Sequence, residues 1–109
     1  MQKSDLAVLQ HAAADACSLL KALANADRLL LLCQMTQGEH CVAELEALTG
    51  IKQPTLSQQL TVLRAEQLVS TRRDGKQIFY SIKSREAMTL LQVLCEIYCS
   101  PNHKVKNDD

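Results

Sequence analysis

Aromatic residues are scarce in this chain. Its 109 residues include no Trp, two Tyr and one Phe, although 47% of them are hydrophobic. Sheets packed face to face draw on aromatic and β-branched side chains, so the composition argues against a β-sandwich and favours helices built from leucine and alanine. A chain of this length forms one small domain, and burial against a partner subunit would add to its stability.

Long apolar runs are also missing. No run approaches the roughly 18 apolar residues that cross a bilayer, and the N-terminus lacks a basic stretch followed by an apolar core. We therefore expect neither a membrane span nor a signal peptide, and we expect a cytoplasmic protein.

The cysteines do not form the framework of a secreted disulfide protein, because their number is odd and their spacing irregular. In a reducing compartment each is a buried filler, a metal ligand or a reactive thiol. The five are Cys17, Cys33, Cys41, Cys95 and Cys99.

Net charge is zero, with 12 basic and 12 acidic residues, which by itself argues against nucleic-acid binding. The charges are unevenly distributed, however. Residues 52–85 carry seven basic and two acidic side chains, whereas the segments on either side are acidic. Such a local basic patch is what contact with a phosphate backbone requires.

Apolar residues at three- and four-residue steps predict a first helix from about Asp5 to Leu23. This stripe consists of Leu6, Leu9, Ala13, Cys17, Leu20 and Leu23. Asn25 provides an N-cap for a second helix, which ends at Gly38. Four consecutive leucines, "LLLL", cover every face of that helix, so we expect it to be central and buried nearly all round.

A short third helix, from about Val42 to Leu48 with Gly50 as its stop, precedes a fourth helix that Pro54 opens. Proline fits the first turn because it has no N–H to donate. The apolar stripe of the fourth helix is Leu56, Leu60 and Leu63. Two helices joined by a tight turn, the second with a polar outer face, indicate a helix-turn-helix.

Two stretches of alternating apolar and polar residues, "LVSTRR" and "KQIFYSI", flank Asp74-Gly75 and predict a β-hairpin wing with a two-residue turn. A fifth, amphipathic helix is marked by Met88, Leu91, Leu94, Cys95 and Tyr98. We therefore predict a mainly α, winged helix-turn-helix domain of five helices and a two-stranded wing over residues 1–100. Residues 101–109 form a polar tail that we expect to be disordered.

The outer face of the fourth helix is rich in side chains that both donate and accept hydrogen bonds, and such side chains can read base edges in a major groove. The base-reading candidates are Gln53, Thr55, Ser57, Gln58 and Gln59. The candidates for phosphate or minor-groove contacts are Arg64, Arg72, Arg73 and Lys76. A solvated helix beside a solvated hairpin is the plainer alternative, but the order of short helix, proline-opened helix and basic hairpin favours DNA binding.

Three stretches, "LLKALANADRLLLLCQM", "GIKQPTLSQQLTVLRAEQLVSTRRDGKQIFYSI" and "IYCS", resemble the ArsR/SmtB family of bacterial winged-helix repressors. The resemblance spans about Leu19 to Ser100. It implies a homodimer with the first and last helices at the interface. The two recognition helices would then face half-sites of a palindromic operator about one helical turn apart.

Two cysteine positions resemble one subgroup of that family, the BigR/SqrR-type sulfide-responsive repressors, together with the related HlyU-type regulators. The subgroup carries one cysteine on the second helix and one near the end of the last, matched here by Cys33 and Cys99. The resemblance implies that reactive sulfur species or oxidants join these thiols by a disulfide or polysulfide bridge, which releases the repressor from DNA. Thiol reactivity would require a nearby positive charge or helix N-terminus, and some exposure. The operator, the target genes, the natural inducer and the form of the bridge stay open.

A metal-responsive repressor is the first alternative. Many relatives bind metals through Cys-x-Cys on the third helix, but "CVAEL" keeps Cys41 and has Ala43 at the second position, and the last helix has no histidine. His40 would add one ligand to Cys41, whereas zinc wants three or four N or S ligands. His11, His40 and His103 are more simply read as surface residues, so we assign no metal and no cofactor.

The other two cysteines, Cys17 and Cys95, lie on apolar stripes and are expected to fill the core. Cys95 and Cys99 are four residues apart and could pair, although helix geometry strains such a bridge.

The DNA-reading unit departs from the family at two positions. Gln59 stands where histidine is common in "SQHL", which bears on base preference. Gln67 stands where glycine is common in "DGLV", so a residue with a Cβ occupies a position at which a left-handed conformation favours glycine.

Two other classes of function fit the sequence less well. A thiol enzyme would need a cysteine beside a base or a CxxC motif, and the chain has neither, so we predict that it is not an enzyme. An adaptor that does not bind DNA would explain the neutral net charge but not the basic wing.

Overall fold

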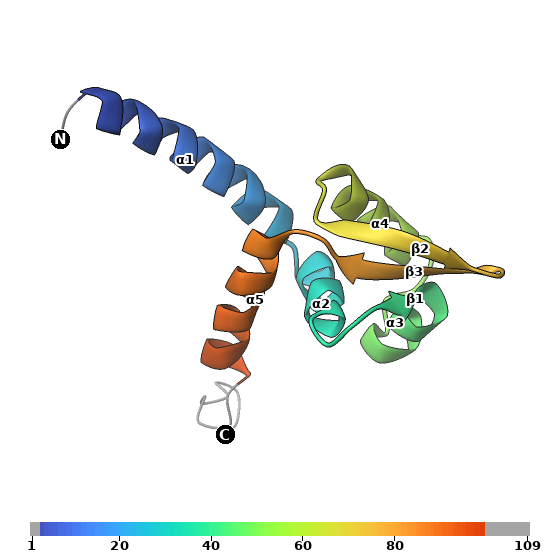
Figure 1. The fold of residues 1–109 in the computed structure, drawn as a ribbon. Helices are drawn as coiled ribbons and strands as arrows, with labels where there is room; N and C mark the ends of the chain where they lie inside the picture. The colour runs from blue at the N-terminus through green and yellow to red at the C-terminus, as the bar shows by residue number, and fades with distance from the viewer. Residues whose placement is uncertain (1–2, 100–109) are drawn as a thin grey trace, which may run out of the picture.

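The computed structural model describes residues 3–99, which fold into five helices and a three-stranded sheet (Figure 1). The helices are α1 (Lys3–Leu23), α2 (Ala26–Met35), α3 (Val42–Thr49), α4 (Thr55–Ala65) and α5 (Arg85–Tyr98). The strands are β1 (His40–Cys41), β2 (Val69–Asp74) and β3 (Gln77–Ile82). The predicted winged helix-turn-helix fold is confirmed, and the predicted tail over 101–109 lies outside the described residues.

The sheet has the strand order β1-β3-β2 and is antiparallel throughout. The prediction of two strands is therefore wrong by one. β1 contains only His40 and Cys41, which pair with Tyr80 and Phe79 of β3, and two residues are too few to show the alternation by which a strand is recognised. Through β1, the segment before α3 is hydrogen-bonded to the wing.

The turn of the wing lies one residue later than predicted. Asp74 is the last residue of β2 and pairs with Gln77, so the turn residues are Gly75 and Lys76 rather than Asp74-Gly75. Gly75 has φ of 65°, and one class of tight hairpin turn requires glycine at its first central position. The turn therefore places Lys76 at the tip of the wing.

The core is rich in leucine, as the composition predicts. Its largest fully buried side chains are Leu31, Leu32, Met35, Leu45, Leu56, Leu60, Leu63 and Leu91. The prediction that α2 is buried nearly all round is wrong, since Leu30 is 41% exposed. Four leucines in a row point in every direction around a helix, and the rest of residues 3–99 covers only part of its circumference.

Helix ends follow the predicted capping residues with two shifts. α2 ends at Met35, with Thr36 as its C-cap, before the predicted stop at Gly38. Asn25 caps α2 by accepting a hydrogen bond from the Arg28 N–H at 3.0 Å, and Gly50, with φ of 76°, ends α3. Pro54 lies one position before α4 rather than inside its first turn. It is the N-cap, because its carbonyl accepts the first helical hydrogen bond, from the Gln58 N–H at 3.1 Å.

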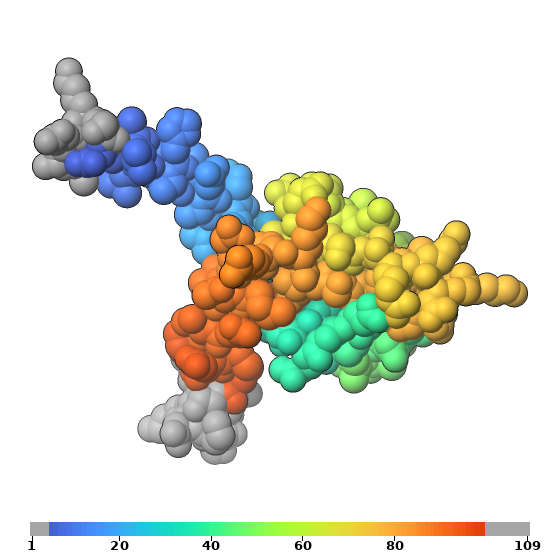
Figure 2. All heavy atoms as spheres, in the orientation of Figure 1, coloured from blue at the N-terminus to red at the C-terminus, as the bar shows by residue number. Residues whose placement is uncertain are grey.

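Most of α1 and the C-terminal part of α5 extend away from the rest of the molecule (Figures 1 and 2), while Leu23 and Leu91 are buried in the core. Every side chain of α1 from Asp5 to Ser18 is exposed. The large exposed hydrophobic residues of the two helices are Leu6, Val8, Leu9, Leu20, Val93, Ile97 and Tyr98. Most of the apolar stripe that predicts α1 is thus left uncovered within a single chain. The stripe of α5 is buried at Leu91 but exposed at Tyr98, with Val93 and Ile97 exposed beside it.

By length and composition alone, α1 is also the one helix within residues 3–99 that could cross a membrane. Its mean hydropathy is 1.2 over Asp5–Leu23, and 11% of that window is buried. This is weak evidence for a span, because a helix that packs against a second subunit can be equally apolar.

Candidate functional site

α4 presents polar side chains on the side opposite its buried leucines. Ser57 and Gln58 are exposed, as is Gln53 just before the helix, while Thr55 and Gln59 are half-buried. The buried side of the helix is formed by Leu56, Leu60 and Leu63. The structure therefore brings the five base-reading candidates together around the N-terminal half of α4.

Gln53 contributes to the start of that helix. Its Oε1 accepts a hydrogen bond from the Ser57 N–H at 3.0 Å, an amide close to a helix N-terminus, where the first backbone N–H groups lack a full set of helical partners. Gln53 thus supplies a side-chain acceptor at a position where the capping residue, Pro54, has none.

Gln59 is held by Arg28, a residue that the sequence reasoning missed. The Arg28 guanidinium donates from Nη1 to Gln59 Oε1 at 3.0 Å, from Nε to the Ala22 carbonyl at 2.7 Å, and from Nη2 to the Lys21 carbonyl at 3.2 Å. It thereby connects the C-terminal end of α1 to α4. Arg28 and Gln59 are 31 residues apart, so no local pattern pairs them.

The basic candidates differ in their surroundings. Arg72 donates from Nε and Nη2 to the two carboxylate oxygens of Glu39, at 3.1 and 2.5 Å, and its guanidinium lies 4.8 Å from the centre of the Phe79 ring. The hydrogen bond from Arg72 lowers the pKa of Glu39. Arg72 Nη1 lies 3.7 Å from Asp74 Oδ2, so two carboxylates compete with a phosphate for this guanidinium. The other three are exposed: Arg64, Arg73 and Lys76.

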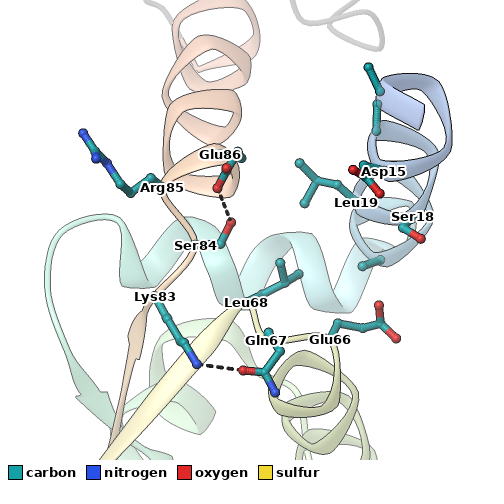
Figure 3. A pocket seen from close by; sticks show the side chains of 13 residues that line it. Asp15, Ser18, Leu19, Glu66, Gln67, Leu68, Lys83, Ser84, Arg85 and Glu86 are labelled. Carbon is teal, nitrogen blue, oxygen red and sulfur yellow. Dashed lines mark hydrogen bonds between the residues drawn. The ribbon is translucent and has the colours of Figure 1, made fainter. Parts of the chain in front are cut away.

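The junction between α4 and β2 is bonded to the junction between β3 and α5. Gln67 has φ of 62°, the left-handed conformation in which its Cβ was expected to be unfavourable. Its Oε1 accepts a hydrogen bond from Lys83 Nζ at 2.7 Å (Figure 3), and the Leu68 carbonyl accepts one from the Lys83 N–H at 2.8 Å. The C-terminal end of α4 is thus tied to the start of α5.

An open groove of about 840 Å³ lies between α1 and these two junctions (Figure 3). Its lining is mainly apolar but includes charged residues of both signs. The charged residues are Asp15, Glu66, Lys83, Arg85 and Glu86. Neither sign of charge predominates clearly in the groove, so its charges do not select for an anionic or a cationic ligand.

Three thiols lie on α2 and at the end of α5. Cys33 is half-buried against the core, whereas Cys95 and Cys99 are exposed. Burial, followed by the charge of Cys95, raises the pKa of Cys33. A hydrogen bond with Cys99, followed by the charge of Cys99, raises the pKa of Cys95. Both shifts are opposite to the activation by positive charge that a low-pKa thiol requires.

The remaining cysteines are Cys17 and Cys41. The prediction that Cys17 and Cys95 fill the core is wrong for this chain, because both are exposed on stripes that the rest of residues 3–99 does not cover. Cys41 is buried and is the N-cap of α3, with its N–H donating to Glu44 Oε1 at 2.9 Å.

Within residues 3–99, no group of three or more His, Cys, Asp or Glu side chains is arranged to hold a metal ion. His40 Nδ1 lies 2.6 Å from the Glu39 carbonyl oxygen and 4.0 Å from the Glu44 carboxylate. His11 is exposed, and His103 lies outside the described residues.

Comparison of the sequence with known proteins finds a family and close relatives. The family described as "Bacterial regulatory protein, arsR family" matches residues 25–71. A biofilm growth-associated repressor from Agrobacterium fabrum is 46% identical over 100 residues, which are 92% of this chain and 86% of that protein. The transcriptional activator HlyU of Vibrio cholerae is 37% identical over 98 residues, 90% of this chain and 91% of that protein.

Solved structures agree with the sequence comparison. The transcriptional repressor BigR from Xylella fastidiosa has a TM-score of 0.80 at 44% identity, over 92% of this chain and 99% of that chain. A homodimeric winged helix-turn-helix DNA-binding domain from Mycobacterium bovis has a TM-score of 0.66 at 30% identity, over 96% of each chain. These relatives are named as regulators and not as enzymes. By identity, coverage and fold, this chain belongs to the ArsR family of bacterial transcriptional regulators.

Proposed function

We propose that the protein is a cytoplasmic, homodimeric repressor that binds a palindromic operator while its thiols are reduced. Reactive sulfur species, or oxidants, join Cys33 to Cys99 by a disulfide or polysulfide bridge and release it from DNA. The observation that carries the proposal is the placement of the thiols. Cys33 lies on α2, which contacts α4 through Arg28, and Cys99 ends α5, a helix with an uncovered apolar face.

DNA binding is supported by the combination of the polar face of α4 with a wing whose tip is basic. Gln58 and Ser57 are exposed where α4 would enter a major groove, and Arg73 and Lys76 are exposed on the wing. Polar side chains of this kind read base edges, and cations on a flanking hairpin bind the backbone or the minor groove.

A homodimer is supported by the exposed apolar residues of α1 and α5. Leu9 is 51% exposed and Ile97 52% exposed, and an apolar surface of this extent on a small domain usually lies in an interface. The homodimeric relative from Mycobacterium bovis has the same fold. A two-fold dimer would present two copies of α4 to the two half-sites of an operator.

The switch is supported by the different positions of the two thiols in such a dimer. Cys33 is part of the body that carries α4, and Cys99 is at the end of a helix that we place at the interface. A covalent bridge between them would bias the orientation of the two DNA-reading units relative to each other. The dimer is the element with two arrangements that such a switch needs.

The test is binding of the protein to a duplex taken from upstream of its own gene, measured at two salt concentrations before and after treatment with sodium tetrasulfide. We expect binding by the reduced protein that weakens with salt, as for any contact with phosphates, and release after treatment. Reduction with dithiothreitol should restore binding. The variants Cys33→Ser and Cys99→Ser should bind DNA and resist release, whereas Cys17→Ser serves as the matched control and should respond like the wild type.

The alternatives predict different results. The absence of salt-dependent binding by the reduced protein would favour the adaptor. Binding that tetrasulfide leaves unchanged and zinc abolishes would favour a metal sensor.

A further inference from the structure

Cys95 belongs to a row of α5 residues that begins with two core residues and ends with two exposed thiols. Ala87, Leu91, Cys95 and Cys99 follow one another at four-residue steps, and residues at this spacing lie on one side of a helix. Ala87 and Leu91 are fully buried in the same cluster as Leu31 and Leu32 of α2. The row therefore extends from the contact between α5 and α2 toward the two thiols.

Helix geometry places Cys95 nearer to α2 than it places Cys99. Each four-residue step advances about 6 Å along the axis and turns about 40° around it. Cys95 is one such step beyond the buried Leu91, and Cys99 is two steps beyond it, where the helix has ended. Cys33 lies on α2, packed against the same core cluster. Cys95 thus lies between the α2 contact and Cys99.

The electrostatics of the thiols agree with this order. Cys95 is the charged neighbour that raises the pKa of Cys33, and Cys99 is the neighbour that hydrogen-bonds to Cys95. In the series Cys33, Cys95, Cys99, the second thiol therefore raises the pKa of the first, and the third raises that of the second.

We propose that Cys95 is a third member of the thiol site and the first thiol to bridge to Cys33, with Cys99 entering by exchange. This rests on the proposed thiol switch and adds a residue to it. The geometric reason is that Cys95 lies one helical turn closer to α2 than Cys99 does. Cys99 is the neighbour of Cys95 on the same face of α5.

The chemistry balances with a low-molecular-weight persulfide or polysulfide as the oxidant. The Cys33 thiolate takes the sulfane sulfur of the reagent, which gives a Cys33 persulfide and leaves the reagent's remaining sulfur as a thiolate. The Cys95 thiolate then attacks Cys33 Sγ, forming the Cys33–Cys95 disulfide and expelling hydrosulfide, so that the sulfane sulfur is reduced as the two thiols are oxidised. Attack of the Cys99 thiolate on Cys33 Sγ gives Cys33–Cys99 and releases the Cys95 thiolate, an exchange without net oxidation.

The test maps the bridges in full-length protein treated with sodium tetrasulfide and quenched with an alkylating agent at a series of times. Digestion must include a protease that cleaves after glutamate. Glu96 lies between Cys95 and Cys99, and Glu39 lies between Cys33 and Cys41. Trypsin is added to cleave at Lys21 and Arg28, between Cys17 and Cys33, so that each cysteine falls in a different peptide. In the wild type we expect Cys33–Cys95 to precede Cys33–Cys99.

Two variants make the test decisive, and both replace exposed side chains, so the fold should be kept. Cys99→Ser should still form Cys33–Cys95 at the wild-type rate, while Cys95→Ser should form its bridge about tenfold more slowly, because the attacking thiol is farther away. Cys17→Ser is the control. If Cys99→Ser forms no bridge and Cys95→Ser bridges at the wild-type rate, Cys95 is not part of the site.

DNA binding separates this proposal from the switch itself. A wild-type protein that forms Cys33–Cys99 directly and leaves DNA would overturn the role of Cys95 and keep the switch. A wild-type protein that forms Cys33–Cys95 first and then Cys33–Cys99, yet stays on DNA, would support the role of Cys95 and overturn the switch.

Discussion

Arg28 of α2 is hydrogen-bonded to two other helices, α1 and α4. Its guanidinium donates to two carbonyls at the end of α1 and to Gln59 of α4. Because a guanidinium can only donate, Gln59 turns its carbonyl oxygen toward Arg28, and its Nε2 is left as the group that faces outward. We therefore expect Gln59 to contact an acceptor on DNA, such as a phosphate oxygen or a purine N7.

Replacing Arg28 tests how much this contact stabilises the fold. Arg28→Met removes three hydrogen bonds from a half-buried cation, and we expect the free energy of unfolding to fall by about 2 kcal/mol. Urea denaturation followed by circular dichroism measures it. Arg64→Met, on the exposed side of α4, should change it by less than about 0.5 kcal/mol. Equal losses in both variants would contradict a special role for Arg28.

The raised pKa values of Cys33 and Cys95 predict how fast the reduced thiols react. Only the thiolate is a nucleophile, and the pKa of Cys33 is raised chiefly by burial and that of Cys95 chiefly by its hydrogen bond with Cys99. At neutral pH the thiolate fraction is therefore small, and it grows as the pH approaches the raised pKa. Alkylation of Cys33 by iodoacetamide should accelerate by about tenfold from pH 7 to pH 8. A rate that does not change over this interval would mean that the thiolate is already formed.

At the scale of elements, the α4–β2 junction carries backbone strain. Gln67 has φ of 62°, which costs a residue with a Cβ about 1 kcal/mol or more, while its hydrogen bond with Lys83 is exposed and offsets only part of that cost. We expect Gln67→Gly to raise the free energy of unfolding by about 0.5 to 1 kcal/mol. Gln67→Ala keeps the Cβ and loses the hydrogen bond, so chemical denaturation should show it to be no more stable than the wild type. A less stable Gln67→Gly would show that the bond with Lys83 matters more than the backbone.

One cation of the wing, Arg72, is paired with Glu39. Since Arg72 is bound to Glu39 in the structure, the variant Glu39→Gln should free it for DNA and increase affinity at low salt. The slope of log affinity against log salt should become steeper by about the amount that one phosphate contact contributes. Lys76→Gln, at the wing tip, should make the slope shallower by a similar amount. Fluorescence anisotropy at several salt concentrations measures both. An unchanged slope in Glu39→Gln would mean that Arg72 does not contact a phosphate.

At the scale of the whole molecule, the proposed homodimer rests on the exposed apolar residues of α1 and α5. Leu9 is 51% exposed on α1, and a charge at this position should be costly in an apolar interface. We expect Leu9→Glu to give a monomer in sedimentation velocity and to lower operator affinity by about 100-fold, because two linked half-site contacts are reduced to one. Leu48→Glu alters an equally exposed leucine on α3 and should remain dimeric. A dimeric Leu9→Glu would place the interface elsewhere.

Much of this architecture could be predicted from local patterns. The stripe of Leu56, Leu60 and Leu63 predicts which side of α4 is buried, and all three are buried. The Asn25 cap and the Gly50 stop are set by a few neighbouring residues, and both lie where they were expected. The wing turn lies one residue later than the sequence predicts. Asp74 can either end a strand or begin a turn, and only the register of β2 against β3 decides between them.

The sequence by itself determined the helices, the hairpin and the polar face of α4, because each depends on the spacing of residues a few positions apart. It did not determine which residues contact each other across the fold. The contact of Arg28 with Gln59, the pairing of Arg72 with Glu39 and the two-residue strand β1 join segments far apart in the chain. Exposure likewise depends on which elements pack together, and Cys17 and Cys95, apolar-stripe residues by sequence, lie outside the core of the single chain. The tertiary structure alone placed Cys95 between the α2 contact and Cys99, because only packing decides which face of α5 lies against α2.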